Sequence, residues 1–276
     1  MGCIYSLVGI EYTLVWNSTG LLNFSHDKFI TLGAYFFAVT FLTKMGVNPI
    51  VSVLAALVVM FLFGSAVAAG VFNPLRNMSS PIFAVMGTVV LGRIISEAIR
   101  LIWGPVQFVV FTFLPGVVHI GNIVVAVAYF WITGVSALLV IGLQVFFKTT
   151  RAGKAMRCVQ QNKTAAALMG IDVARSIIFT IALSSVVCTI IGVLITPLFT
   201  IDLTLASMIG LKGFAAGVIG GFGNLPGTIL GGIIIGIVEN LSTLVLPAVY
   251  RDCVAFILMV SFLLIRPSGI LGPRRK

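Results

Sequence analysis

Long apolar runs alternate with short polar or Gly-containing interruptions along almost the whole chain. A helix that crosses a membrane needs roughly 20 mostly apolar residues, and the pattern gives eight such helices on a strict count or nine on a generous one. The expected spans cover residues 2–19, 28–44, 50–72, 81–103, 122–147, 175–199, 204–222, 227–246 and 250–266. The pattern therefore predicts an all-α, polytopic membrane helix bundle that forms a single transmembrane domain over residues 1–276.

The stretch at residues 104–121 does not fit the span pattern, although it is apolar. Pro105 and Pro115 interrupt it, and a glycine stands at each end. A proline removes a backbone donor and disrupts the interior of a helix. We therefore expect an external loop here, with a segment that dips into the membrane as the alternative.

The segment Lys148–Arg175 is the one substantial polar island in the chain. It holds six of the 17 Lys and Arg residues and a single acid, Asp172. Positive charge is retained on the cytoplasmic side during membrane insertion, so we expect a cytoplasmic loop over residues 148–175. With this loop and the basic C-terminal tail both inside, nine spans place the N-terminus outside and the C-terminus in the cytoplasm.

Two Gly-containing regions, at residues 20–36 and 217–240, are interrupted by short breaks at residues 23–28 and 220–226. Non-helical backbone at membrane depth is tolerated only where protein or a water-filled cavity satisfies its polar groups, and paired breaks of this kind mark the substrate path of a transporter. The predicted substrate pathway consists of Asn23, Ser25, His26, Gly221, Gly223, Asn224 and Glu239. The alternative is that both breaks are tight turns between antiparallel helices, with small residues that allow close packing.

Charged residues inside apolar spans are costly, and each one suggests a role. Arg93, Glu97 and Arg100 follow one another at four- and three-residue spacing, which puts them on one helix face and predicts a ladder of ion pairs. Glu239 follows the second break, where it faces an external vestibule or anchors its helix at the membrane surface. Lys212 is expected near a membrane boundary, since a lysine can extend its amine towards water.

Two further ionisable residues have roles that the sequence leaves open. Glu11 lies in the middle of the first apolar run, where it is protonated, paired with a cation on another helix, or detrimental to function. His26 precedes Asp27, and a neighbouring carboxylate raises the proton affinity of a histidine. The alternative for His26 is an ordinary polar loop residue.

The composition agrees with a membrane protein and argues against other classes. Hydrophobic residues make up 59% of the 276 residues and charged residues only 9%, which is too apolar for a water-soluble domain. The net charge is +10, but the cations lie in short loops, the tail and helix ends, so we expect no nucleic-acid partner. The four cysteines lack CxxC spacing, and we expect neither a metal site nor a disulfide framework.

Four motifs, in this order, make the chain similar to a known family. They are GLLNFSH at residues 20–26, RAGKAMRCVQQNKTAAALMGID at 151–172, GVIGGFGNLPGTILGGIIIG at 217–236 and RPSGILG at 266–272. Together they resemble the inner-membrane permease subunits of bacterial branched-chain amino acid ABC transporters, of the H type. The resemblance implies a multi-pass protein of the bacterial cytoplasmic membrane, in contact with membrane lipid, that imports leucine, isoleucine or valine.

The same resemblance implies partner proteins. A second permease subunit, identical or different, completes the pore, two cytoplasmic ABC ATPase subunits supply the energy, and a periplasmic or lipid-anchored binding protein delivers the substrate. The chain has no G-x-x-x-x-G-K-[ST] phosphate loop. We therefore expect a transport subunit without an ATPase site or cofactor of its own, with ATP bound by the partner subunits.

ABC permeases share a cytoplasmic element, Glu-Ala-Ala, three residues, Gly, whose short helix sits in a groove of the ATPase. The matching positions here are Thr164, Ala165, Ala166, Ala167, Leu168, Met169 and Gly170, with Thr164 in the place of the glutamate. Alanine is a strong helix former, and glycine readily ends a helix. The resemblance implies that these residues couple the pore to the ATPase, and the alternative is an inert, positively charged loop.

Other functions remain open at this level. An ABC permease for urea or short amides would share the same motifs. A stand-alone secondary transporter would also have interrupted helices, but it would not need the Ala-rich loop. A membrane enzyme would need a cluster of nucleophile, base or metal ligands, which the scattered acids and two histidines do not provide.

Overall fold

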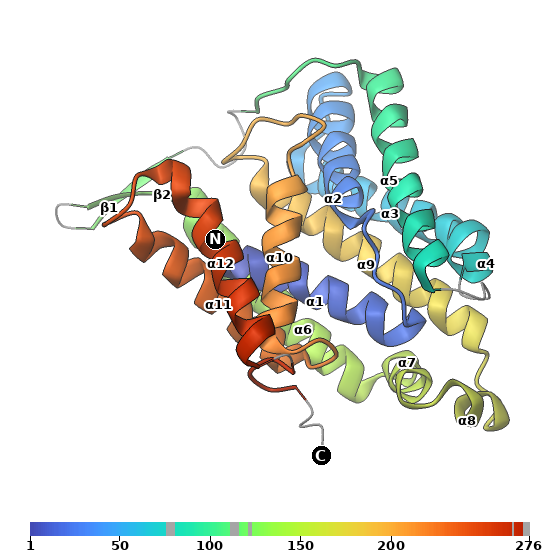
Figure 1. Cartoon of the computed structure of the whole chain (residues 1–276). Helices are drawn as coiled ribbons and strands as arrows, with labels where there is room; N and C mark the ends of the chain where they lie inside the picture. Colours follow the sequence, from blue (N-terminus) through green and yellow to red (C-terminus); the bar gives the residue numbers. More distant parts are fainter. Residues whose placement is uncertain (76–80, 111–115, 121–122, 267, 273–276) are drawn as a thin grey trace. The chain divides into compact units, whose positions relative to one another are not determined.

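A computed structural model describes the chain except residues 76–80, 111–115, 121–122, 267 and 273–276 (Figure 1). The described residues form two compact units. The first comprises Met1–Asn17 and Ser207–Lys276, and the second comprises Ser18–Ala206. A single permease domain over residues 1–276 stays a prediction.

The first unit is helical. Its elements are α1 (Gly2–Thr19, up to Asn17), α10 (Ser207–Gly220), α11 (Leu225–Ser242), the short 3₁₀-helix η3 (Ala248–Tyr250) and α12 (Arg251–Ile265). The helices α10, α11 and α12 lie side by side and contact one another (Figure 1). Hydroxyl groups fix α1 on α11, since Ser6 Oγ donates to Ile229 O (2.9 Å) and Thr13 Oγ1 lies 3.1 Å from Thr228 Oγ1.

The C-terminal segment at residues 268–272 closes this unit by binding the turn between α10 and α11. The backbone N–H groups of Ile270 and Leu271 donate to the carbonyl oxygens of Ile219 (2.8 Å) and Gly220 (3.2 Å). In return, Asn224 Nδ2 donates to Leu271 O (2.7 Å). The C-terminal segment thus satisfies carbonyl groups that the end of α10 would otherwise leave unpaired.

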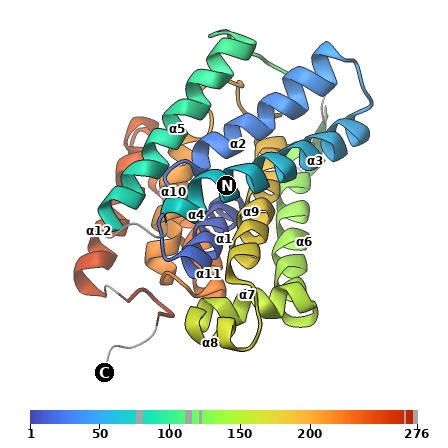
Figure 2. The same ribbon diagram turned by 90° about the vertical axis from the view of Figure 1, so that its right-hand side faces the viewer.

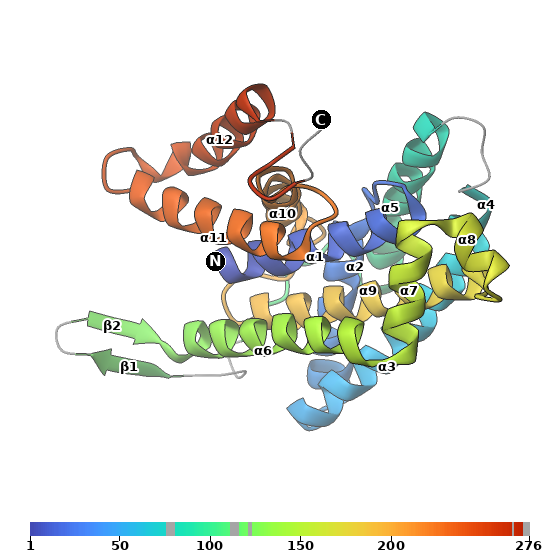
Figure 3. The same ribbon diagram turned by 90° about the horizontal axis from the view of Figure 1, so that it is seen from below.

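The second unit contains the remaining elements. They are α2 (His26–Ala34), η1 (Tyr35–Lys44), α3 (Pro49–Val67), η2 (Ala68–Phe72), α4 (Asn73–Leu75), α5 (Pro81–Trp103), β1 (Val117–Ile120), β2 (Ile123–Ala126), α6 (Val127–Thr149), α7 (Arg151–Gln161), α8 (Lys163–Leu168) and α9 (Val173–Ile195). The helices α6 and α9 run alongside each other, and α7 crosses their ends (Figures 2 and 3).

Helix α9 is the core of the second unit. Its apolar stretch is 72% buried, which is more than in any other candidate span that the structure describes. It packs against α2 and α3. Small residues bring the backbones together, because a Cβ atom at Gly33 would lie 2.8 Å from Thr189 Cα and one at Gly192 would lie 2.6 Å from Ile30 O. Close approach through small residues is the usual basis of helix packing in membranes.

The prediction of a mostly helical membrane protein is confirmed. Five helices in the described part of the chain are long and apolar enough to cross a membrane: Pro49–Leu75, Ile82–Trp103, Val127–Thr149, Val173–Ile195 and Leu225–Ser242. The count of eight or nine spans stays a prediction. α1 has the length of a span but carries Glu11 and Asn17, and α2 continues as a π-helix, η1.

The start of one predicted span and the all-α class were wrong. The span expected from residue 122 begins at Val127, because residues 123–126 form strand β2, which pairs antiparallel with β1. This hairpin is the exception to the all-α prediction. The stretch expected to be an external loop contains an isolated antiparallel β-bridge, in which Phe108 and Ile201 each donate a backbone N–H to the carbonyl oxygen of the other.

Candidate functional site

The first break, between α1 and α2, is an ordered and buried turn. Asn23 Oδ1 accepts hydrogen bonds from the backbone N–H of Ser25 (3.0 Å) and from Ser25 Oγ (2.6 Å). An Asn side chain that bonds the backbone two residues ahead closes a turn without help from a helix. Asn23, Ser25 and His26 are all buried, so the structure brings these three predicted pathway residues together.

Helix α5 shows how deep this turn lies. Thr88 Oγ1 accepts from the N–H of Phe24 (3.2 Å) and donates to Leu22 O (3.4 Å). One turn further along, a Cβ atom at Gly92 would lie only 3.3 Å from Ser25 Cα. Gly92 is at the middle of the candidate span Ile82–Trp103, so the turn lies beside the centre of that candidate span. Non-helical backbone at such a level is tolerated where protein buries it or where it lines a water-filled cavity, and a pathway role for Asn23, Ser25 and His26 stays a prediction.

Charged side chains at the start of α2 contact the segment that follows α9. Lys28 Nζ forms an ion pair with Asp27 Oδ2 (3.0 Å) and donates to Leu203 O (3.1 Å). The two side chains are mostly buried. Lys28 therefore ties the first break to the connection that follows α9.

The second break, in the first unit, is a tight turn. Gly221 and Gly223 have φ angles of 99° and 92°, which favour glycine, and α11 begins one residue after Asn224. The turn is held by the C-terminal segment and by Asn17 Nδ2, which donates to Gly223 O (3.2 Å). This geometry fits the alternative of a turn between antiparallel helices, and a pathway role for Gly221, Gly223 and Asn224 stays a prediction.

Glu239 lies at the other end of α11, roughly 22 Å along the helix from Asn224 at 1.5 Å per residue. Its side chain is 1% exposed and belongs to an ionic cluster, which we define as Lys212, Glu239, Arg251 and Asp252. Lys212 Nζ lies 2.7 Å from Glu239 Oε1 and 2.6 Å from Asp252 Oδ1. Arg251 Nε lies 2.6 Å from Glu239 Oε1. A pathway role for Glu239 stays a prediction.

The ionic cluster joins three helices and has no net formal charge. Lys212 comes from α10, Glu239 from α11, and Arg251 and Asp252 from the first turn of α12. The Lys212 amine also lies 5.5 Å from the ring centre of Tyr5 on α1, within range of a cation–π contact. Buried charges are found in proteins when they are paired in this way.

Sequence reasoning missed these partnerships. It expected Lys212 near a boundary and gave no role to Arg251 and Asp252. The sequence did contain a signal for the pairing of Lys212. Charged residues are rare in these apolar helices, and a charged residue in such a helix usually pairs with an opposite charge on a neighbouring helix.

The predicted coupling loop contains two short helices, α7 and α8, and the first residues of α9. Asn162 caps α8 by accepting from the N–H of Ala165 (3.0 Å), and Asp172 caps α9 by accepting from the N–H of Arg175 (3.1 Å). Between them, Gly170 ends the turn with a φ of 82°. Each cap satisfies a donor that a helix start leaves open.

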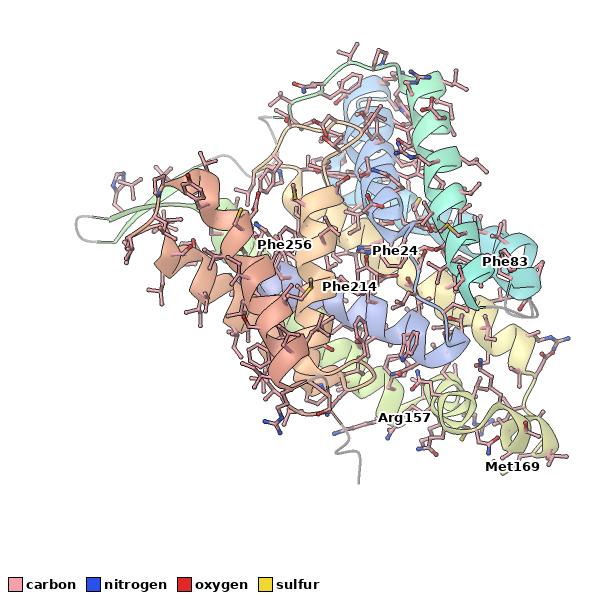
Figure 4. All side chains as sticks on the ribbon, in the orientation of Figure 1. Phe24, Phe83, Arg157, Met169, Phe214 and Phe256 are labelled. Carbon is pink, nitrogen blue, oxygen red and sulfur yellow. The ribbon has the colours of Figure 1, made fainter. Side chains whose placement is uncertain are left out.

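Helix α8 turns a small apolar surface outwards. Ala166 is buried against the protein, whereas Leu168 and Met169 are 85% and 70% exposed. Met169 stands at the outer end of the helix (Figure 4). Thr164, Ala165, Ala167 and Gly170 are exposed as well, so the structure gathers the predicted coupling residues on one protruding element.

Lys163 links α8 to the end of α1, which precedes the first break. Its Nζ donates to Thr19 O at 2.7 Å, and Thr19 is the last residue of α1. A cation at the C-terminus of a helix is favourable because the free carbonyl groups there carry partial negative charge. Sequence reasoning placed Lys163 in the basic loop but did not find this contact.

Comparison with known proteins confirms the predicted resemblance. Residues 1–263 match the family model described as the permease component of branched-chain amino acid transport systems. The chain is 29% identical to the high-affinity branched-chain amino acid transport system permease protein LivH of Escherichia coli K12 and 30% identical to BraD of Pseudomonas aeruginosa, in both cases over 99% of this chain and 92% of the relative. It is 29% identical to the probable branched-chain amino acid transport permease protein LivH of Methanocaldococcus jannaschii, over 96% of this chain and 88% of that protein.

No solved structure matches the chain. The family match runs through both interrupted regions, the coupling loop and most of the last helix. The chain therefore belongs to the family of branched-chain amino acid transport permeases.

Proposed function

We propose that this chain is a transmembrane permease subunit of an ABC importer for amino acids, with leucine, isoleucine and valine as substrates. The curated relatives named above are permease proteins for branched-chain amino acids, and they support this substrate class. The proposed topology has nine spans in the cytoplasmic membrane, with the C-terminus in the cytoplasm. It places the basic segment Lys148–Arg175 inside, and the excess of positive charge in that segment supports this orientation.

The observation that carries the proposal is the protruding helix α8. A short helix with exposed Leu168 and Met169, a capping Asn162 and a glycine stop offers a rigid apolar surface to a soluble partner. Exposed apolar side chains on a polar, water-facing segment mark an interaction site. The partner that this surface fits is an ABC ATPase, which binds and hydrolyses the ATP.

The contact between Lys163 and Thr19 supplies a route for coupling. When an ATPase moves α8, Lys163 carries the displacement to the end of α1 and so to the turn at Asn23 and Ser25. ATP binding changes the pore only through contacts that differ between its two states. The route joins the coupling helix to the buried turn within one compact unit.

The remaining parts of the importer come from other chains. A second permease subunit completes the pore, and an external binding protein delivers the amino acid. The turn beside the centre of α5 forms part of the path, with the polar groups of Asn23 and Ser25 at membrane depth.

The test is uptake of labelled leucine in bacterial cells that lack their own branched-chain importers and express this chain with its cognate ATPases and binding protein. Met169→Asp places a charge on the apolar surface of α8, and we expect loss of ATPase copurification and of uptake. Gln161→Asp places the same charge in the same loop, outside the proposed contact surface, and serves as the matched control.

Two results would contradict the proposal. Tagged protein that never copurifies an ATPase would favour a stand-alone secondary transporter. Uptake that urea suppresses more strongly than leucine or valine would favour a permease for urea or short amides.

A further inference from the structure

Helix α5 carries a charged face that the fold leaves exposed. Arg93, Glu97 and Arg100 are all exposed, although Ile82–Trp103 is a candidate membrane span. Within the second unit, α5 packs against α2 and α4 (Figure 2). The charged residues therefore do not belong to the packed side of the helix.

The three charges do not form the predicted ladder. Glu97 Oε2 and Arg100 Nη2 pair at 2.6 Å, so these two residues neutralise each other near the end of the span. Among the residues that the structure describes, Arg93 has no ion-pair partner on α5 or its neighbours. The charged face therefore presents one uncompensated guanidinium group.

The depth of Arg93 makes contact with lipid unfavourable. In the 22-residue candidate span Ile82–Trp103 it is preceded by eleven residues and followed by ten, so the proposed topology puts it near the middle of the membrane. The headgroups are then roughly 15 Å away on either side, which exceeds the reach of the side chain. Arginine at this depth faces the bundle interior or a water-filled cavity.

Arg93 also adjoins the buried turn. Gly92, the preceding residue, approaches Ser25 closely, and Thr88 bonds the backbone of Leu22 and Phe24. Arg93 is therefore attached to α5 at the level of the broken backbone at Asn23–Ser25, and both belong to one compact unit.

We propose that Arg93 lines the aqueous substrate path and binds the carboxylate of the amino acid as it passes the middle of the membrane. A guanidinium presents two parallel N–H donors that match a carboxylate, and every amino acid substrate carries that group whatever its side chain. This inference rests on the proposed function, since it names the site at which the imported amino acid is held.

Two substitutions test the binding role. Arg93→Gln removes the charge, and we expect leucine uptake to fall about 10-fold or more, mainly as a higher KM, because a charge-assisted hydrogen bond to the substrate is lost. Arg93→Lys keeps the charge without the bidentate geometry and should recover part of the uptake. Arg100→Gln, on the same face at the end of the span, is the matched control and should stay close to wild type.

Thiol labelling tests the water path without relying on transport. In a variant whose four native cysteines are replaced by serine, Arg93→Cys should react with a charged, membrane-impermeant methanethiosulfonate applied from one side. In the assembled importer, leucine should slow this reaction. A second reporter, Val89→Cys, lies on the same exposed face and retains Arg93. Its reaction should be slowed by leucine and less by leucinamide, which lacks the carboxylate.

The outcomes separate this inference from the proposed function. Wild-type importer that takes up no branched-chain amino acid refutes the proposed function. Wild-type uptake together with a fully active Arg93→Gln variant refutes the carboxylate site alone. An Arg93→Cys variant that reacts only with lipid-soluble maleimides, or an Arg93→Gln variant that fails to assemble with its second permease subunit, also overturns the inference, by placing Arg93 in lipid or in a subunit interface.

Discussion

The ionic cluster of Lys212, Glu239, Arg251 and Asp252 sets a clear expectation for stability. The four side chains sum to zero formal charge, and Lys212 and Glu239 are 6% and 1% exposed. Lys212→Met leaves Glu239 and Asp252 with one cation, and Glu239→Gln leaves Lys212 and Arg251 with one acid. Removing one partner of a buried pair costs about 3–5 kcal/mol, because the remaining charge is uncompensated.

The expected loss of stability differs between members of the cluster, because their side chains differ in exposure. The Asp252 side chain is 43% exposed, so water replaces much of what Asp252→Asn removes, and we expect a loss of about 1 kcal/mol or less. The double variant Lys212→Met/Glu239→Gln leaves Arg251 and Asp252, which again sum to zero. We therefore expect the double variant to lose less than the two single variants added together.

Thermal unfolding of the purified protein in detergent, followed by tryptophan fluorescence, measures these effects. At roughly 2–4 °C per kcal/mol, the single variants should unfold about 6–20 °C below wild type. Glu97→Gln, which breaks a pair that is about half exposed, is the control and should shift little. Single variants that match this control, or a double variant equal to the sum of the two, would show that the cluster does not hold α10, α11 and α12 together.

Three further predictions concern the coupling route and the buried turn. Lys163→Ala removes the bond to Thr19 O, so leucine uptake should fall by a factor of about 3 or more while ATPase copurification persists; unchanged uptake would exclude this route. Gly92→Val overpacks the contact with Ser25 and should cost about 1–3 kcal/mol in thermal unfolding, whereas Gly142→Val, with no atom within 4 Å, should cost less. Gly170→Ala and Gly46→Ala both force alanine into a positive φ at a cost of about 1–2 kcal/mol, but only Gly170→Ala should weaken ATPase copurification, and equal losses would place the ATPase contact elsewhere.

Helix bounds could be predicted from the sequence where residues that favour a helix start or a helix end stand at both ends. Helix α5 has the bounds that were predicted, because Pro81 suits a helix start and Gly104, with a φ of 85°, suits its end. The start of α6 was missed because Ile123, Val124 and Val125 are β-branched and apolar. A short run of that kind fits a strand as well as the first turn of a buried helix.

The partners of charged residues could not be read from spacing. Arg93, Glu97 and Arg100 have the spacing of an ion-pair ladder, yet only Glu97 and Arg100 form a pair. Lys212 and Glu239 are 27 residues apart, and their contact depends on how α10 and α11 pack. The coupling role of residues 164–170 was taken from family resemblance and stays a prediction, whereas the contact of Lys163 with Thr19 depends on tertiary structure and could not be read from the sequence.

The C-terminal segment that binds the α10–α11 turn has a practical consequence for following motion. Ile270 and Leu271 bind the turn through backbone hydrogen bonds, and Leu271 is 43% exposed. A spin label or fluorophore on a cysteine at position 271 would therefore leave the hydrogen bonds in place. Such a probe would travel with the ends of α10 and α11, and its distance to a second label would report the transport cycle in real time.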